Sequence, residues 1–306
     1  MLGNEFSEGS RRYVGRFAPS PTGLLHFGSL VAATASYLEA RARRGKWLIR
    51  IDDIDPPREI PGSADSIVRD LICLGFEPDG PILLQSRRQE AYLAARDQLL
   101  SAGNAFWCGC TRGELPPGPY PGTCRNGLPA GKHRRAVRLK SGTHDTWFED
   151  EIQGRISVNL GNSCGDFVIW RADGLPAYQL ATGIDDADQG ITQVVRGADL
   201  LESTPRQIAV RQALALPSPG YAHVPVATHK GQKLSKSNLD KPLSAQDPWL
   251  VLRQALLFLG QEPPEARTLQ DLWAWAFEHW RLSRVPKVQA LDVSEISGPG
   301  WQNVIL

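Results

Sequence analysis

The sequence predicts an α/β fold built on a parallel sheet. Segments typical of strands and helices alternate through the first hundred residues, a pattern that favours parallel strands joined by crossover helices. The apolar run at 46–53 ends in acidic residues, as a buried parallel strand does. With 306 residues, 42% hydrophobic and 22% charged, the chain can form one large or two modest domains.

The first hundred residues supply the expected elements in order. Alternation at 13–17 predicts a strand, and helical spacing of apolar residues at 28–44 predicts a helix that packs on the sheet. After the strand at 46–53, Ser63 is a good N-cap for a helix that ends at Gly75. A further amphipathic helix is expected over 87–103.

The rest of the chain predicts a second half of the sheet and a helical end. We expect a hairpin at 166–181 with its turn at 172–174, a strand–loop–helix at 193–216, a lysine-rich loop at 229–240, and helices from 248 onward. The expected organisation is a flexible N-terminal extension (1–12), the first half of a Rossmann-like catalytic domain (13–105), an aperiodic insertion (106–145), the second half (146–240), and a small C-terminal helical domain (241–306).

Charge and hydropathy exclude several classes of protein. A net charge of +1 argues against a uniformly basic coat for nucleic acid, although 41–46 and 132–140 are local basic clusters that could contact a polyanion or face solvent. No apolar run approaches the roughly 18–20 residues of a membrane span, and 1–12 lacks a signal-peptide apolar region. We therefore expect a cytoplasmic, soluble protein, and a monomer.

The insertion holds three of the five cysteines. Cys108, Cys110 and Cys124 can supply three thiolates to one structural, tetrahedral Zn²⁺, and the alternative is a reduced cluster without metal. Imidazole chemistry suggests His133 as the fourth ligand. The two isolated cysteines, Cys73 and Cys164, are expected to be small core residues.

Two loops carry residue types that hold phosphates. "RFAPSPTGLLHFGSL" (16–30) places prolines, glycines and a histidine between the first strand and the first helix, where ligands bind in such sheets. The following helix start offers free N–H groups to an anion. "KLSKS" (233–237) carries two lysines that can neutralise a polyphosphate. Each loop alone is also compatible with an ordinary surface turn.

Together the two loops resemble the HIGH and KMSKS motifs of class I aminoacyl-tRNA synthetases. "RFAPSPTGLLHFGSL", "RIDDIDPPR", "PAYQLA", "VVRGADLLESTPRQ" and "KLSKS" further resemble, in order over 13–240, the glutamyl-tRNA synthetase catalytic domain. "CGC" with "YPGTC", and the lack of room for an anticodon-binding region, resemble the shortened glutamyl-Q tRNA(Asp) synthetases. Members of that group activate L-glutamate with ATP without tRNA, then attach it to the queuosine base of tRNA(Asp).

The resemblance implies a class I synthetase fold and a set of site residues. Glutamate-binding positions are Arg16, Phe17, Ala18, Pro19, Ser20, Asp52, Tyr178 and Arg196. ATP positions are His26, Gly28, Lys233 and Lys236, with Mg²⁺ accompanying ATP and with His26 and Lys236 catalytic. The implied zinc ligands are Cys108, Cys110, Cys124 and, in place of His133, Tyr120.

Asp52 departs from the family pattern, which usually has glutamate there. Aspartate is one methylene shorter, so the substrate ammonium could be held through a water, the strand could lie closer, or Asp53 could substitute. Two other functions stay open: a truncated enzyme that charges a tRNA 3′ end, and a non-catalytic RNA-binding paralogue.

Overall fold

The structure is a computed structural model that describes residues 12–234, 247–265 and 268–296. The α-helices are α1 (Phe27–Ala42), α2 (Ser63–Cys73), α3 (Gln89–Ser101), α4 (Leu160–Ser163), α5 (Tyr178–Asp188), α6 (Thr204–Ala213), α7 (Pro248–Phe258) and α8 (Leu269–His279). The strands are β1 (Val14–Phe17), β2 (Lys46–Ile51), β3 (Leu83–Leu84), β4 (Ala105–Cys108), β5 (Ala136–Leu139), β6 (Asp145–Asp150), β7 (Gly154–Asn159), β8 (Phe167–Trp170), β9 (Gln193–Gly197), β10 (Gly220–Val224), β11 (Val226–His229), β12 (Gln232–Lys233) and β13 (Ala290–Asp292).

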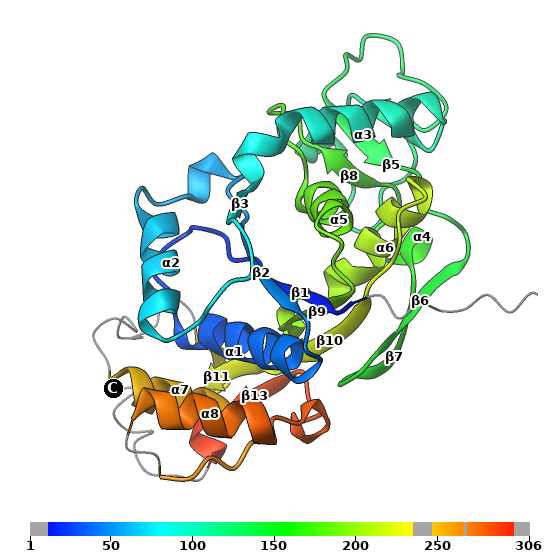
Figure 1. Cartoon of the computed structure of the whole chain (residues 1–306). Helices are drawn as coiled ribbons and strands as arrows, with labels where there is room; N and C mark the ends of the chain where they lie inside the picture. Colours follow the sequence, from blue (N-terminus) through cyan, green and yellow to red (C-terminus); the bar gives the residue numbers. More distant parts are fainter. Residues whose placement is uncertain (1–11, 235–246, 266–267, 297–306) are drawn as a thin grey trace, which may run out of the picture.

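The centre of the molecule is the parallel sheet that the sequence predicted. β1, β2 and β3 pair in parallel, as do β9 and β10, and β10 meets β6 in parallel at one residue pair. β9 lies beside β1, as the hydrogen bond from the Thr192 amide to the Val14 carbonyl over 2.9 Å shows. The strands β1, β2 and β9 therefore end at one edge of the sheet, next to the start of α1 (Figure 1).

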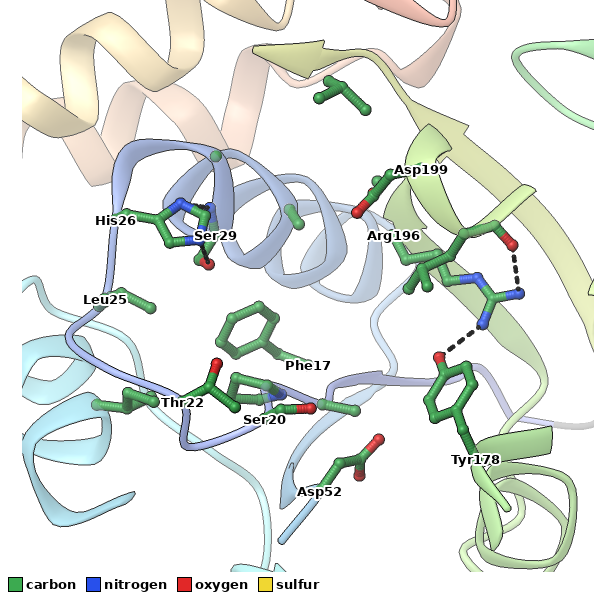
Figure 2. Close-up of a pocket in the computed structure, with 18 of the residues that line it drawn as sticks. Phe17, Ser20, Thr22, Leu25, His26, Ser29, Asp52, Tyr178, Arg196 and Asp199 are labelled. Carbon is green, nitrogen blue, oxygen red and sulfur yellow. Dashed lines mark hydrogen bonds between the residues drawn. The ribbon is translucent and has the colours of Figure 1, made fainter. Parts of the chain in front are cut away.

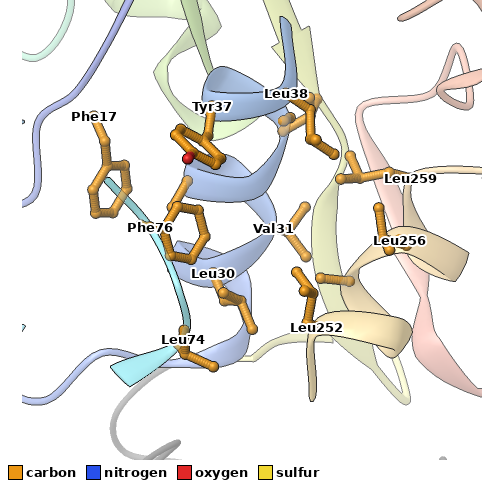
Figure 3. Packing of buried hydrophobic residues seen from close by; sticks show 14 of the residues in the cluster. Phe17, Leu30, Val31, Tyr37, Leu38, Leu74, Phe76, Leu252, Leu256 and Leu259 are labelled. Carbon is orange, nitrogen blue, oxygen red and sulfur yellow. The ribbon is translucent and has the colours of Figure 1, made fainter. Parts of the chain in front are cut away.

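Helix α1 is buried along most of its length between this sheet and the C-terminal helices. Leu30, Val31 and Leu38 belong to the same core as α7 residues such as Leu252, and Figure 3 shows them facing one another. The buried carboxylate of Glu39 also accepts a hydrogen bond from Trp280 Nε1 over 2.8 Å. The C-terminal helices thus share the core of the catalytic half instead of forming their own.

A second core lies around the antiparallel sheet β4–β5–β8, which α3, α5 and α6 cover. β4 and β5 flank the aperiodic part of the insertion, so its ends are anchored in this sheet. Over the described residues, no helix has the length and apolar character needed to cross a bilayer.

The hairpin predicted at 166–181 is confirmed at its turn, 172–174, but its second arm ends earlier than predicted. The chain does turn after β8, and Trp170 bridges to Pro176, but Tyr178 already begins α5. Gly174 adopts a left-handed φ of +86°, which reverses the chain within a few residues. The backbone groups after Ala177 then find their partners inside a helix instead of along β8.

Two residue-level expectations also fail. The N-cap of α2 is Gly62, and the Ser63 hydroxyl instead exchanges hydrogen bonds with the backbone of Gly23. Cys73 is exposed and not a core residue, because it ends α2 on the outer side. Cys164 is half-buried and packs against the second core.

Candidate active site

A cavity of about 520 Å³ opens at the carboxyl edge of the parallel sheet. Its lining includes residues that end β1, β2 and β9, the start of α1, and the start of α5 (Figure 2). Every described residue that the sequence assigned to glutamate or ATP lines it: Arg16, Phe17, Ala18, Pro19, Ser20, His26, Gly28, Asp52, Tyr178, Arg196 and Lys233. Lys236 lies outside the described residues.

The opening loop is held in place by its neighbours. The Asp52 amide donates to the Pro19 carbonyl over 2.9 Å, and the Ile60 amide donates to the Pro21 carbonyl over 3.0 Å. Gly23, with φ of +143°, allows the turn that Ser63 fixes from α2. The many prolines and glycines of this loop therefore form a defined wall of the cavity.

His26 caps helix α1 at the cavity wall. Its Nδ1 accepts from the Ser29 amide over 3.3 Å, and its Nε2 lies 3.0 Å from Ser29 Oγ. Since Nδ1 accepts, the neutral ring carries its proton on Nε2 and donates it to Ser29. The cavity wall thus contains a helix N-terminus, whose positive dipole end favours an anion.

Arg196 carries a fixed positive charge into the cavity. Its Nε donates to His223 Nε2 over 3.0 Å, and its Nη2 donates to Thr204 Oγ1 over 2.7 Å and to Gln207 Oε1 over 2.8 Å. Its Nη1 reaches the Tyr178 hydroxyl over 3.3 Å. These partners are neutral, and within the described residues Arg196 forms no ion pair, so its charge is available to an anion.

His223 supports that arrangement from behind. Burial is the main cause that lowers the pKa of this imidazole, and the nearby Arg196 charge adds to it. Neutral His223 accepts from Arg196 at Nε2 and therefore donates from Nδ1 to Asp150 Oδ2 over 2.6 Å. Sequence reasoning missed both residues, because nothing in a strand sequence shows which side chain it will meet.

Arg16 and Asp52, which also line the cavity, are held by buried partners. Asp186 Oδ1 accepts from Arg16 Nε over 3.2 Å and from Arg50 Nη1 over 2.6 Å. Arg50 Nε in turn donates to Asp52 Oδ1 over 2.7 Å. A continuous chain of ion pairs therefore joins Arg16 to Asp52 beneath the cavity floor.

Asp52, and not Asp53, faces the cavity. Both carboxylate oxygens of Asp53 accept from Ser86, one from its amide and one from its hydroxyl. Burial raises the pKa of the Asp52 carboxyl to about 6, against the opposing pull of Arg50. Asp52 is thus a carboxylate at neutral pH and titrates in mild acid.

Besides Lys233, which the sequence assigned to ATP, the cavity rim holds charged residues that sequence reasoning did not single out, including Asp55, Arg171 and Asp199. Lys233 Nζ donates to Asp199 Oδ2 over 2.6 Å, and Arg171 Nη1 donates to Asp55 Oδ1 over 3.0 Å. All four line the cavity. The acids at the end of the second strand were the one available signal for Asp55.

The three clustered cysteines converge as expected. The Sγ atoms of Cys108, Cys110 and Cys124 lie within 4.8 Å of one another, with Cys110 and Cys124 3.7 Å apart. Two thiolates on one tetrahedral zinc, at about 2.3 Å each, lie about 3.8 Å apart. Burial and the adjacent sulfur of Cys124 raise the pKa of the Cys110 thiol to about 11, so without a cation this thiol is protonated at neutral pH.

Tyr120 lies in the same cluster, whereas His133 does not join it. The Tyr120 hydroxyl is 3.5 Å from Cys108 Sγ and accepts from the Cys124 amide over 2.8 Å. The group of metal-ligating side chains found in the described residues contains the three cysteines and no histidine. Arg138 covers the Tyr120 ring at 3.9 Å and donates to Cys108 Sγ over 3.4 Å.

The basic stretch at 132–140 surrounds this cluster. Lys132 is paired with Glu114, while Arg134 stacks over Trp107 at 5.5 Å and is exposed. A contact between this stretch and RNA stays a prediction.

Comparison with known families decides the fold group. The model described as "tRNA synthetases class I (E and Q), catalytic domain" matches residues 13–117 and 124–268. The chain belongs to this family. As a class I synthetase of the E and Q type, it has the α/β fold with a parallel sheet that the sequence predicted.

Relatives of this synthetase are similar over almost their full length. The glutamyl-Q tRNA(Asp) synthetase of Chromobacterium violaceum is 52% identical over 284 residues, covering 90% of this chain and 95% of the relative. That of Dechloromonas aromatica is 52% identical over 289 residues, covering 90% and 96%.

Solved structures of synthetases show the same fold. The glutamate-tRNA synthetase of Elizabethkingia anophelis superposes with a TM-score of 0.77 at 26% identity, covering 92% of this chain and 68% of that one. A glutamate tRNA ligase of Elizabethkingia meningosepticum, in complex with its amino acid, gives 0.77 at 26% identity, covering 92% and 67%.

Proposed function

We propose that this chain activates L-glutamate with ATP, without tRNA, and transfers it to the queuosine base in the anticodon loop of tRNA(Asp). The observation that carries this proposal is the charge pattern of the cavity, which complements glutamate, in a chain about half identical to relatives named glutamyl-Q tRNA(Asp) synthetases. Glutamate presents two carboxylates and one ammonium. In the cavity lining, the buried Arg16, Arg196 and Asp52 match these three charges. The other charged residues of the lining pair with one another at the rim, Arg58 and Arg171 with Asp55 and Lys233 with Asp199.

Each group has a role that its environment supports. The planar guanidinium of an arginine gives a carboxylate two parallel hydrogen bonds, and the unneutralised charge of Arg196 favours this. Asp52 receives the ammonium, while Tyr178 adds a hydroxyl and an aromatic wall. Ser20 and the backbone of Phe17, Ala18 and Pro19 shape the floor.

Activation needs position and charge neutralisation but no protein nucleophile. A carboxylate oxygen of glutamate bonds to the α-phosphorus of ATP while the bond to the β-phosphate oxygen breaks, giving glutamyl-adenylate and pyrophosphate. His26, Gly28 and the N-terminus of α1 hold the nucleotide, and Lys233 and Lys236 neutralise the departing phosphates. Mg²⁺, held mainly by the phosphates, would shield their charge.

Replacing Asp52 by alanine is expected to raise the KM for glutamate about tenfold or more, with a smaller change in the KM for ATP, because the ammonium loses its counter-charge. In the parent enzyme the same KM should rise as the pH falls below about 6, since Asp52 becomes protonated there. ATP–pyrophosphate exchange at varied glutamate and pH measures both. An unchanged KM in the alanine variant would remove Asp52 from the pocket.

The cysteine cluster is proposed to hold one structural Zn²⁺ through Cys108, Cys110, Cys124 and the Tyr120 phenolate. The spacing of the sulfurs and the phenol oxygen fits tetrahedral coordination. Zinc would fix a segment that has a small core of its own.

Tyr120→Phe is expected to weaken zinc binding by about tenfold or more, because one of four ligands is lost. Competition with a chromogenic chelator, together with the zinc content per chain, measures this. His133→Ala is the matched control and should leave the affinity unchanged. Loss of affinity in the His133 variant alone would assign the fourth position to imidazole instead.

The location of the transferred glutamate tests the whole proposal. Labelled glutamate, ATP and tRNA(Asp) with or without queuosine are incubated with the enzyme, and nuclease digestion identifies the labelled nucleoside. Label on queuosine, and only in the tRNA that contains it, is expected. Label on the 3′-terminal ribose would indicate the tRNA-charging alternative, and absent pyrophosphate exchange would indicate a non-catalytic paralogue.

A further inference from the structure

Two residues outside the cavity lining connect the groups proposed to bind glutamate. Asp186 on α5 and Arg50 on β2 are both buried, with 3% and 0% of their surface exposed, and neither lines the cavity. They form the middle of the ion-pair chain Arg16–Asp186–Arg50–Asp52. Their position beneath both ends of the substrate site suggests a role for the pair beyond stability.

We propose that Asp186 and Arg50 are positioning residues that orient Arg16 and Asp52 as one unit for glutamate binding. This inference rests on the proposed function of the cavity. Because Asp186 accepts from both arginines with the same oxygen, a shift of either arginine changes the contact of the other. One buried carboxylate thus couples the cationic and the anionic ends of the pocket.

The contacts that Asp186 makes leave the substrate-facing atoms of Arg16 available. Asp186 engages Nε of Arg16, and within the described part of the chain the terminal nitrogens of Arg16 form no hydrogen bond. Arg50 likewise engages only Oδ1 of Asp52. An arginine and an aspartate fixed from behind lose less side-chain entropy when the ligand binds.

Helix α5 links this chain of ion pairs to another wall of the cavity. It begins with Tyr178, which lines the cavity, and carries Asp186 two turns later. Its neighbour Asp185 accepts from Gln85, Arg88 and Tyr92, each within 2.7 Å. These bonds fix α5 against α3, so the position of Asp186 is set by the fold and not by the ligand.

The charged groups around Asp52 and Asp186 determine the pKa values of these two carboxyls. The groups that face Asp52 and Asp186 are Arg16 on β1, Arg50 on β2, Asp185 on α5, Arg211 on α6 and Tyr221 on β10, with Arg88 and Tyr92 behind Asp185. Burial alone would raise the pKa of Asp186, but Arg16, Arg50 and Arg211 outweigh it and hold this pKa well below its ordinary value. Asp186 therefore stays charged, and its charge helps to raise the pKa of Asp52.

The test is Asp186→Asn, which keeps the shape and one acceptor but removes the charge. The matched control is Asp188→Asn on the same helix, where the carboxylate is exposed and paired with Arg88 at the surface. Glutamate-dependent pyrophosphate exchange is measured for both variants and the parent from pH 5 to pH 8, with glutamate and ATP varied separately.

For Asp186→Asn we expect the KM for glutamate to rise about tenfold or more and the KM for ATP to stay within about twofold. The rise of the glutamate KM in acid (the acid limb) should also begin at a lower pH than in the parent. The reason is that Asp52 loses a neighbouring negative charge, which lowers its pKa. Asp188→Asn should match the parent in the KM for glutamate, in the KM for ATP and in the pH at which the glutamate KM rises. A variant that only loosened the fold would change the KM for ATP and the thermal midpoint as well.

A glutamate KM within twofold of the parent, with the acid limb unmoved, would overturn the inference. If Asp186→Asn does not fold, Arg50→Lys replaces it: lysine keeps the charge but cannot reach both carboxylates, so the glutamate KM should still rise severalfold, and an unchanged KM overturns the inference. Failure of the parent to support exchange would instead reject the proposed function, and the positioning role would then be judged by calorimetric binding of L-glutamate.

Discussion

Arg196→Ala is expected to lower kcat/KM for glutamate-dependent pyrophosphate exchange by about 10²–10⁴-fold. Two charge-assisted hydrogen bonds to a substrate carboxylate contribute about 1.5–3 kcal/mol each, and each 1.4 kcal/mol corresponds to a factor of ten. The variant also removes the donors that satisfy the buried Thr204 and Gln207. The loss should fall mainly on the glutamate KM, because Arg196 is proposed to bind the amino acid and not the nucleotide.

Two comparison variants make this result specific. Arg196→Lys keeps the charge without the planar fork and should show an intermediate loss. Arg155→Ala, on the exposed β6–β7 hairpin, makes the same substitution at an arginine outside the cavity lining and should leave exchange unchanged. An Arg196→Ala enzyme with a normal KM for glutamate would place the carboxylate elsewhere in the cavity.

Lys236→Ala is expected to lower pyrophosphate exchange by about 10²-fold or more, mainly in kcat. An ammonium aimed at charge that develops on the departing phosphates stabilises the transition state more than bound ATP, so kcat falls while the KM for ATP changes little. Steady-state exchange kinetics at saturating glutamate separate the two parameters. Full activity of this variant would exclude Lys236 from the reaction.

Lys233→Ala is the informative partner variant. Lys233 is already neutralised by Asp199 at the cavity rim, and both side chains are about half exposed. Its removal should therefore cost much less than removal of Lys236. If Lys233→Ala loses as much exchange activity as Lys236→Ala or more, Lys233 and not Lys236 would be the main residue that stabilises the departing phosphates.

The parallel sheet was predictable because it depends on local sequence, whereas the glutamate and ATP residues of the cavity lining were predicted from the resemblance to the glutamyl-tRNA synthetase catalytic domain. A strand followed by a loop rich in proline and glycine and then by a helix defines the carboxyl edge of such a sheet, and Arg16, Asp52 and Arg196 each stand at the end of a strand. Residues at that edge converge whatever the details of packing. Their placement in one cavity therefore follows from topology.

The supporting residues were not predictable, because their roles depend on long-range contacts. Asp186 is one acid among three on α5, and only the packing of α5 against β1 and β2 distinguishes it from the exposed Asp188. Ser63 has the sequence of an N-cap, yet its hydroxyl is captured by Gly23, 40 residues away. The second arm of the hairpin predicted at 166–181 is shorter than expected for a similar reason, because the residues after the turn could either continue as a strand or begin a helix.

The burial of α1 against the C-terminal helices has a consequence for folding. Helix α1, whose N-terminus is proposed to face the nucleotide, also shares a core with Leu252, and its Glu39 accepts a hydrogen bond from Trp280. Separate unfolding of the C-terminal helices would expose the apolar face of α1 to water and break the hydrogen bond between Trp280 and Glu39, so these segments belong to one cooperative unit. Any ligand that binds at the start of α1 should therefore protect the amides of α7 and α8 from hydrogen exchange, although it touches neither helix.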